Sequence, residues 1–194
     1  KPIGAHLIDS NYAWKVKPDD DGRISKFKVR VVARGFRQVY GVHFHSSMAP
    51  VGKLQTFRAL LAEAARRGMD IQMLDVRSAY LCSEIDIPNY MTPPPGTNPP
   101  TPGHVMKLTR PLYGTRQGAF CWHQQIDGDM RGWGFKTSTA DPCLYIRRRG
   151  KSVLRILLFV DDMAIFSDND EDGMAMKKEF IKTLGDKYKF STGH

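Results

Sequence analysis

The first third of the chain contains two runs in which apolar and polar residues alternate. Trp14-Lys15-Val16-Lys17 forms the first run, and Phe27 to Ala33 forms the second, with a Pro-Asp-Gly-rich segment at 18–22 between them. Alternation with a period of two is typical of a strand with one apolar face, and proline, aspartate and glycine favour a turn. The pattern predicts a β-hairpin within residues 12–42.

Helical periodicity appears in three later segments. In the first, Leu54 to Arg67, apolar residues recur at helical spacing, and Gly68 follows as a common helix stop. The second segment covers roughly 118–132 and the third 171–184, the last preceded by aspartates and an asparagine that can cap a helix. We therefore expect three amphipathic helices.

Apolar runs too short for helices predict strands at 70–76, 143–148, 153–160 and 163–166, with a helical turn at 77–81. Seven of the twelve prolines lie between Pro88 and His104, which predicts a surface loop at 88–104 without regular structure. The order of elements predicts an α+β fold, an antiparallel sheet with helices packed on one face. We expect one structural unit without a clear linker, divided into a hairpin region at 1–53 and a larger region at 54–194.

The composition narrows the class of partner. The formal net charge is +9, from 29 lysines and arginines against 20 aspartates and glutamates, which points to a polyanion. No apolar run approaches the roughly 20 residues that span a bilayer, and the N-terminus has no signal-peptide pattern. The three cysteines are widely spaced, which fits a reducing, intracellular compartment better than a disulfide framework or a zinc site.

Two adjacent carboxylates, Asp161 and Asp162, interrupt the apolar run from Leu157 to Phe166. An unpaired charge is costly in such surroundings, so the pair is expected at the tip of a β-hairpin. Taken alone, an Asp-Asp pair is more often an acidic surface turn than a site. Asp75 changes this balance because it also ends an apolar strand. If the two strands are neighbours, the carboxylates converge, as they do in sites that hold two Mg²⁺ ions about 3.5–4 Å apart.

The chain carries motifs at 28–38, 49–51, 75–81, 107–117 and 159–162, which together resemble those of the copia-type LTR-retrotransposon reverse transcriptases. Residues 107–117 (KLTRPLYGTRQ) are similar to the family's KL-x-x-SLYGLKQ segment, and residues 28–38 (KVRVVARGFRQ) to its KARLVA(K/R)GF-x-Q segment. The segments at 49–51, 75–81 and 159–162 resemble APV, DVKTAFL and YVDD in the same order. The resemblance extends from the N-terminus to about Phe180 and implies the fingers and palm of a polymerase, with an antiparallel palm sheet.

The resemblance also implies roles for individual residues. Asp75 and Asp161 are implied as metal ligands, and Asp162 as an accessory one, because neighbouring strand side chains diverge. Tyr80 falls where the family places an aromatic residue that blocks a ribose 2′-hydroxyl; without the family, a half-buried core tyrosine is the alternative. Lys28 and Arg30 share a strand face and are implied to contact the triphosphate, although such pairs are often only a solvated edge. The implied residues are Asp75, Asp161 and Asp162 for catalysis and metal binding, the carbonyl of Val76 for metal, and Lys28, Arg30, Ser78, Ala79, Tyr80 and Gln117 for dNTP binding.

The function implied is RNA-directed DNA polymerisation with two Mg²⁺ ions, for which Mn²⁺ is a possible substitute. The expected partners are an RNA or DNA template with its primer and a dNTP, with no membrane involved. The thumb, RNase H and integrase parts of a Pol polyprotein are expected but absent from these residues. The cytoplasm, within a virus-like particle, is the implied location. Two alternatives remain: a truncated or co-opted copy that only binds nucleic acid, and a generic basic RNA-binding domain.

Overall fold

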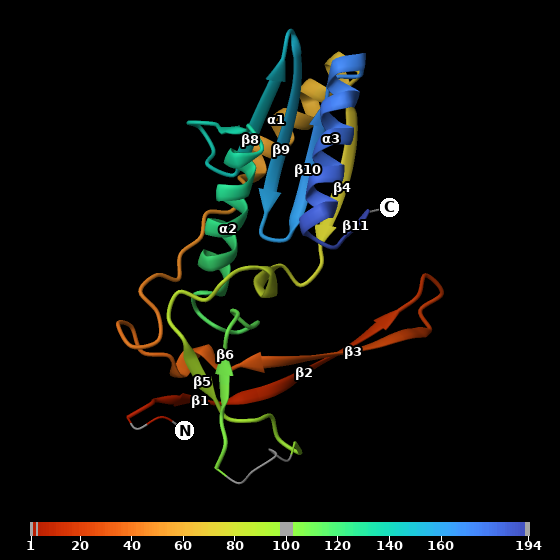
Figure 1. Cartoon of the computed structure of the whole chain (residues 1–194). Helices are drawn as coiled ribbons and strands as arrows, with labels where there is room; N and C mark the ends of the chain where they lie inside the picture. Colours follow the sequence, from red (N-terminus) through yellow and green to blue (C-terminus); the bar gives the residue numbers. More distant parts are fainter. Residues whose placement is uncertain (1, 3, 98–102, 193–194) are drawn as a thin grey trace. The chain divides into compact units, whose positions relative to one another are not determined.

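The computed structural model describes residues 2, 4–97 and 103–192, and these residues form two compact units. The first unit combines the residues up to Met48 with Ser83–Trp122, and the second combines Ala49–Cys82 with the residues from His123 onward. The expected division at residue 53 differs from this arrangement, because residues 83–122 pack with the N-terminal region. Figure 1 shows the elements of each unit along the chain.

The first unit is built on the predicted hairpin. Strands β2 (Ser10–Pro18) and β3 (Ile24–Ala33) pair antiparallel, with Trp14 opposite Val29 and Lys15 opposite Lys28. A short 3-10 helix, η1 (Gly35–Arg37), follows. The hairpin is confirmed because alternation and turn residues are local signals.

A second, three-stranded sheet completes the first unit. Strand β5 (Asn89–Met91) pairs in parallel with β1 (Leu7–Ile8) and antiparallel with β6 (Met106–Leu108). The prediction that 88–104 holds no regular element is therefore wrong for 89–91, and residues 98–102 lie outside the described part of the chain. The strand forms because the four residues between Pro88 and Pro93 are not prolines and keep N–H groups that can pair. The first unit has its own buried core, in which Ile8 and Ala33 pack with Met91 and Leu108. This packing joins residues from the N-terminal region with residues from 83–122.

The second unit contains a six-stranded sheet in which every neighbouring pair is antiparallel. The strand order is β11-β4-β10-β9-β8-β7, so β4, which carries Asp75, and β10, which begins at Asp162, lie side by side. The strands are β4 (Asp70–Val76), β7 (Lys136–Thr137), β8 (Leu144–Arg149), β9 (Ser152–Phe159), β10 (Asp162–Ser167) and β11 (Phe190–Thr192).

The predicted helices are confirmed. Helix α1 spans Leu54–Arg67 and ends at Gly68, which adopts the left-handed conformation at φ 64°. Helix α3 spans Glu171–Lys187 and is capped by Asp170, whose carboxylate accepts a hydrogen bond from the backbone N–H of Gly173. Helix α2 (Gly118–Gly132) begins in the first unit and continues in the second, and η2 (Ala79–Cys82) is the predicted helical turn.

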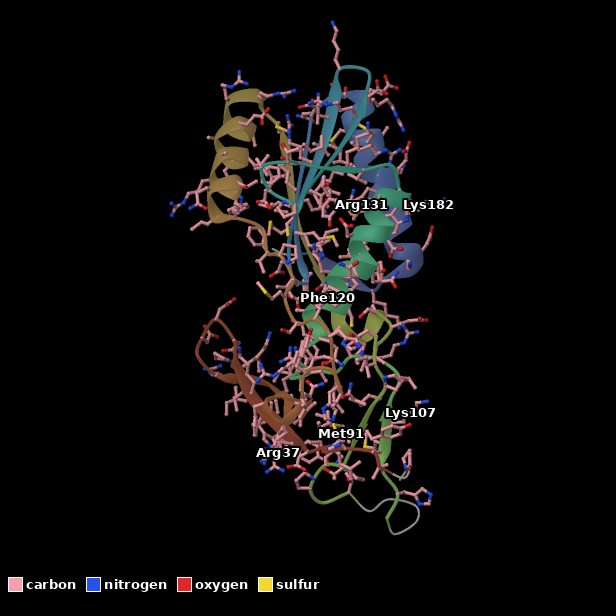
Figure 2. All side chains as sticks on the ribbon, turned by 90° about the vertical axis from the view of Figure 1, so that its left-hand side faces the viewer. Arg37, Met91, Lys107, Phe120, Arg131 and Lys182 are labelled. Atoms are coloured by element: carbon pink, nitrogen blue, oxygen red, sulfur yellow. The ribbon has the colours of Figure 1, made fainter. Side chains whose placement is uncertain are left out.

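The helices of the second unit cover both faces of its sheet, so the expectation of helices on one face is wrong. Figure 2 shows α1 on one side of the strands and α2 and α3 on the other. On the α1 side, the Phe57 ring lies edge-on to Phe166 of β10. On the opposite side, Tyr145 of β8 donates a hydrogen bond to Asp127 of α2 at 3.0 Å. Both faces need cover because β9 and β10 are almost continuously apolar rather than alternating.

In the described part of the chain, no helix combines the length and apolar character that crossing a membrane requires.

Candidate active site

Three carboxylates gather at one end of the central strands of the second unit. Asp162, the first residue of β10, lies directly opposite Asp75 of β4. Asp161 stands in the two-residue turn between β9 and β10. The backbone N–H of Val76 donates to the carbonyl oxygen of Asp161 at 2.8 Å, which ties this turn to the end of β4. The structure therefore brings together the three aspartates that the sequence predicted.

The turn itself has an unusual backbone. Val160, the residue before Asp161, adopts φ 54°, in the left-handed region. A β-branched side chain is disfavoured there, at a cost of the order of 1–3 kcal/mol. A two-residue hairpin requires positive φ at such a position, and most hairpins place glycine or asparagine there. The strained residue belongs to the turn in which the Asp161 carbonyl accepts the hydrogen bond from Val76, the residue after Asp75.

The surroundings of this cluster disfavour the ionised forms of its side chains. Desolvation, followed by the negative charges of Asp161 and Asp75, raises the pKa of the Asp162 carboxyl. Desolvation, followed by the charge of Asp161, also raises the pKa of the Tyr80 phenol. Tyr80 therefore lies close enough to the cluster to sense the charge of Asp161. A cation bound among these groups would relieve the repulsion.

The residues that follow Asp75 differ in how far they are exposed to a ligand. Ser78 is exposed and adopts φ 56°, whereas Ala79 is fully buried, so only its backbone is available for contact. Tyr80 is half-buried within η2. Arg77 is exposed as well, so the side chains of Arg77 and Ser78, and part of Tyr80, reach the surface beside Asp75.

Ser191 is a neighbour of the cluster that the sequence analysis missed. Strand β11 pairs with β4 and places Ser191 opposite Asp75, and the Ser191 hydroxyl lies 3.4 Å from the Asp75 carboxylate oxygen, to which it donates. The family resemblance ended near Phe180 and the predicted helix at Leu184, and a three-residue strand is below the length that periodicity detects. The weak signal was the β-favouring Phe190-Ser191-Thr192 after the last helix.

The donors at the cluster are of the kind that Mg²⁺ prefers, because carboxylate oxygens are hard ligands. Among residues 2, 4–97 and 103–192, no three His, Cys, Asp or Glu side chains are gathered in a metal-binding arrangement. Mg²⁺ commonly takes only one or two protein carboxylates and completes its shell with water and substrate phosphates. Asp75 and Asp161 fit that mode of binding, and a closed protein cage is not required.

The other predicted residues belong to the first unit. Lys28 and Arg30 lie at alternate positions of β3, and the Arg30 guanidinium stands over the ring of Tyr113, 5.1 Å from its centroid. Gln117 is fully buried, and its amide is occupied on both sides. Its oxygen accepts from Gln38 at 2.8 Å, and its nitrogen donates to the carbonyl of His43 at 2.8 Å. The amide of Gln117 therefore joins segments within this unit. Its role in dNTP binding stays a prediction.

Comparison with known proteins gives a consistent result. The family model described as "Reverse transcriptase (RNA-dependent DNA polymerase)" matches residues 1–192. A retrovirus-related Pol polyprotein from transposon TNT 1-94 of Nicotiana tabacum is 32% identical over 166 residues, which are 84% of this chain and 12% of that protein. The Pol polyprotein from transposon RE1 of Arabidopsis thaliana is 32% identical over 165 residues, 84% of this chain and 11% of that protein.

A yeast relative covers more of the chain. The truncated transposon Ty1-A Gag-Pol polyprotein of Saccharomyces cerevisiae is 30% identical over 196 residues, which correspond to 94% of this chain and 14% of that protein. In each of these matches the chain corresponds to only 11–14% of the length of its relative.

Proposed function

Because this chain belongs to the reverse transcriptase family, in its copia-type retrotransposon branch, we propose that it is the fingers and palm part of an RNA-directed DNA polymerase. The single observation that carries the proposal is the placement of Asp75 opposite Asp162, with Asp161 in the adjoining turn. The proposed location is intracellular, within the particle formed by such elements. The remaining parts of a Pol polyprotein are proposed partners.

The proposed reaction is nucleotidyl transfer. The oxygen of the primer 3′-hydroxyl attacks the α-phosphorus of a dNTP in line, a new P–O bond forms, and the bond to the bridging oxygen of pyrophosphate breaks. Pyrophosphate leaves, and the hydroxyl proton passes to solvent. Two Mg²⁺ ions, when bound, supply neutralisation of the charge that develops on the phosphate oxygens. The protein contributes mainly positioning and electrostatic preorganisation.

Each residue of the cluster has a proposed part in this reaction. Asp75 and Asp161 hold the metal, and Asp162, whose pKa is raised, supports them. The exposed hydroxyl of Ser78 and the backbone of Ala79 face the nucleotide phosphates. Tyr80 stands beside the sugar, where its ring excludes a 2′-hydroxyl. In the first unit, Lys28 and Arg30 are the proposed contacts to the triphosphate, and Gln117 contributes by supporting the nucleotide site.

The test is dTTP incorporation on poly(rA)–oligo(dT) in the presence of Mg²⁺ or Mn²⁺. Asp161→Asn should reduce incorporation by at least about a hundredfold, because it removes one ligand charge from the cluster. Asp186→Asn is a matched control, since it makes the same chemical change at an exposed position of α3. Equal incorporation by the wild type and by Asp161→Asn would refute the assignment of Asp161 to the polymerase active site.

The alternative of a module that binds nucleic acid without copying it is not favoured by the comparisons. It has its own outcome in the same assay. Tight binding of poly(rA)–oligo(dT) by the wild type without any metal-dependent incorporation would favour it over the polymerase.

A further inference from the structure

Arg116 is an exposed arginine whose side chain is held in one orientation by the first unit. Its Nε donates to the backbone carbonyl of Gly35 at 3.1 Å. Its guanidinium stands over the ring of Phe44, 5.9 Å from the ring centroid, and Phe44 is itself buried. Its backbone N–H donates to the Gln38 side-chain oxygen at 2.6 Å. Both ends of this residue are therefore fixed.

The groups that hold Arg116 are themselves immobilised by a close backbone contact. A Cβ atom added at Gly35 would lie 2.0 Å from the carbonyl oxygen of Gly114. Gly114 adopts φ 90°, and a Cβ atom there would lie 2.2 Å from the carbonyl oxygen of Ala33. The two turns thus meet backbone to backbone, an approach that only glycine allows.

Gln38 is fixed in the same way. It is 6% exposed, and its amide nitrogen donates to the side-chain oxygens of Gln117 at 2.8 Å and of Asn89 at 3.3 Å. Because the oxygen and the nitrogen of its amide both have partners, Gln38 cannot rotate without leaving one of them unsatisfied. The oxygen that holds the Arg116 backbone therefore has a single position.

Within the described part of the chain, no hydrogen bond or ion pair engages the two terminal nitrogens of Arg116. No carboxylate within the described residues lies within ion-pairing distance of Arg116, whereas its neighbour in the same region, Arg37, pairs with Asp9 at 2.8 Å. An arginine fork presents two parallel N–H groups that match the oxygens of a phosphate. Most exposed arginines lose side-chain entropy when they bind, but this one is already ordered.

We propose that Arg116 is a phosphate-binding residue, preorganised by Gly35, Gln38 and Phe44. Its ligand is a phosphate group, either the triphosphate of a dNTP or the backbone of a primer–template duplex. The net charge of +9 favours both polyanions over an acidic peptide of low charge. This inference deepens the proposed function, because it names a residue that binds the substrate of that reaction.

A purely structural role is the competing explanation. The bond from Nε to Gly35 and the contact with Phe44 could simply join two loops of the first unit. The two explanations differ in their consequences: a structural role affects thermal stability, whereas phosphate binding affects affinity at temperatures where the variant is folded.

The test compares Arg116→Ala with Arg110→Ala in the full chain. Arg110 is also exposed in the first unit and has no hydrogen bond or ion pair among the described residues, so the two variants lose the same charge. Isothermal titration measures binding of dTTP and of inorganic triphosphate, and fluorescence anisotropy measures binding of poly(rA)–oligo(dT) at several salt concentrations. No turnover is needed, so failure of the polymerase assignment would leave this result readable.

Arg116→Ala should weaken binding of at least one probe about tenfold relative to Arg110→Ala, the effect of one charge-assisted hydrogen bond. A loss for dTTP and triphosphate identifies the nucleotide as the source of the phosphate. A loss for the duplex with a lower salt slope identifies the nucleic-acid backbone. Equal affinities of Arg116→Ala and Arg110→Ala for all three probes would overturn the proposal.

Arg116→Lys separates orientation from charge and serves as the second variant if Arg116→Ala fails to fold. Lysine keeps the positive charge but lacks the fork that Gly35 and Phe44 orient. It should recover less than half of the free energy of binding lost by Arg116→Ala. Wild-type affinity in Arg116→Lys would overturn the role of the fixed fork.

Discussion

Asp162 lies directly opposite Asp75 across the pairing of β10 with β4, so two carboxylates share one sheet face at the end of these strands. On the neighbouring strand β9, Phe159 is the residue paired with Asp162. The ring of Phe159 contacts that of Phe57 in α1, at a centroid distance of 5.9 Å. The carboxylates therefore lie on the face that α1 covers, just where the apolar packing ends. Two like charges directly opposite each other on paired strands lower the stability of the fold.

Desolvation of Asp162, together with the charges of Asp161 and Asp75, predicts a pH-dependent stability for the Asp162→Asn variant. Because the pKa of Asp162 is raised in the folded protein, ionising it costs stability, and the cost appears as the pH rises through the folded pKa. Asp162→Asn removes this cost and should raise Tm at pH 7 by up to about 3 °C. Below the ordinary carboxyl pKa both states are protonated, so the gain should vanish near pH 3. Calorimetry at the two pH values measures it, and an equal Tm difference at both would contradict the explanation.

The backbone of Val160 predicts a second gain in stability. Glycine accepts φ 54° without the Cβ penalty, although it loses more conformational entropy on folding. Val160→Gly should therefore stabilise the protein by about 1 kcal/mol. Val160→Ile is the matched control, because it keeps the β-branched carbon and should leave the free energy of unfolding unchanged. Urea denaturation of the three proteins decides it, and a clear loss in Val160→Gly would show that the turn is not strained.

The contact between Gly35 and Gly114 predicts a large loss. Gly35→Ala places a methyl group 2.0 Å from a backbone oxygen, and the turns must separate to accommodate it. We expect a loss of about 2–4 kcal/mol. Gly128→Ala, in the middle of α2 with open space around its Cβ position, should instead stabilise by about 0.5–1 kcal/mol. Similar free energies of unfolding for the two variants would disprove the close approach.

The proposed position of Tyr80 beside the sugar predicts a change in nucleotide selection. Tyr80→Ala should raise the ratio of rUTP to dTTP incorporation at least about tenfold, because the ring no longer fills the space of a 2′-hydroxyl. Tyr80→Phe keeps the ring and should preserve the wild-type ratio. Single-nucleotide primer extension gives both ratios. If Tyr80→Ala discriminates as well as the wild type, another residue selects the sugar.

Local signals account for the parts of the fold that the sequence predicted correctly. The residues of α1 carry their own periodicity and a C-terminal glycine, so its bounds match the structure at both ends. The hairpin of β2 and β3 carries its own alternation and turn. The residues of the candidate site also carry a local signal, because Asp75, Asp161 and Asp162 are charges within or next to apolar strands, where charges are unusual; their roles stay predictions.

Contacts between distant segments account for what the sequence analysis missed. Strand β5 exists because Leu7 and Ile8 pair with residues 83 positions further along the chain, and β11 exists because β4 offers it an edge. Neither strand is long enough to be detected from its own residues. The burial of Gln117 depends on Gln38 and His43, whose positions no local pattern shows. Its role at the nucleotide stays a prediction.

By itself, the sequence determined the helices, the hairpin, the pair of acidic strand ends and the family, because each depends on residues close together in the chain. Only the tertiary structure decided that residues 83–122 pack with the N-terminal region, that both faces of the larger sheet are covered, and that Arg116 is held by Gly35, Gln38 and Phe44. These features depend on burial and backbone contact between segments that are far apart in sequence. Such contacts stabilise the fold but produce no periodic pattern of apolar residues in either segment.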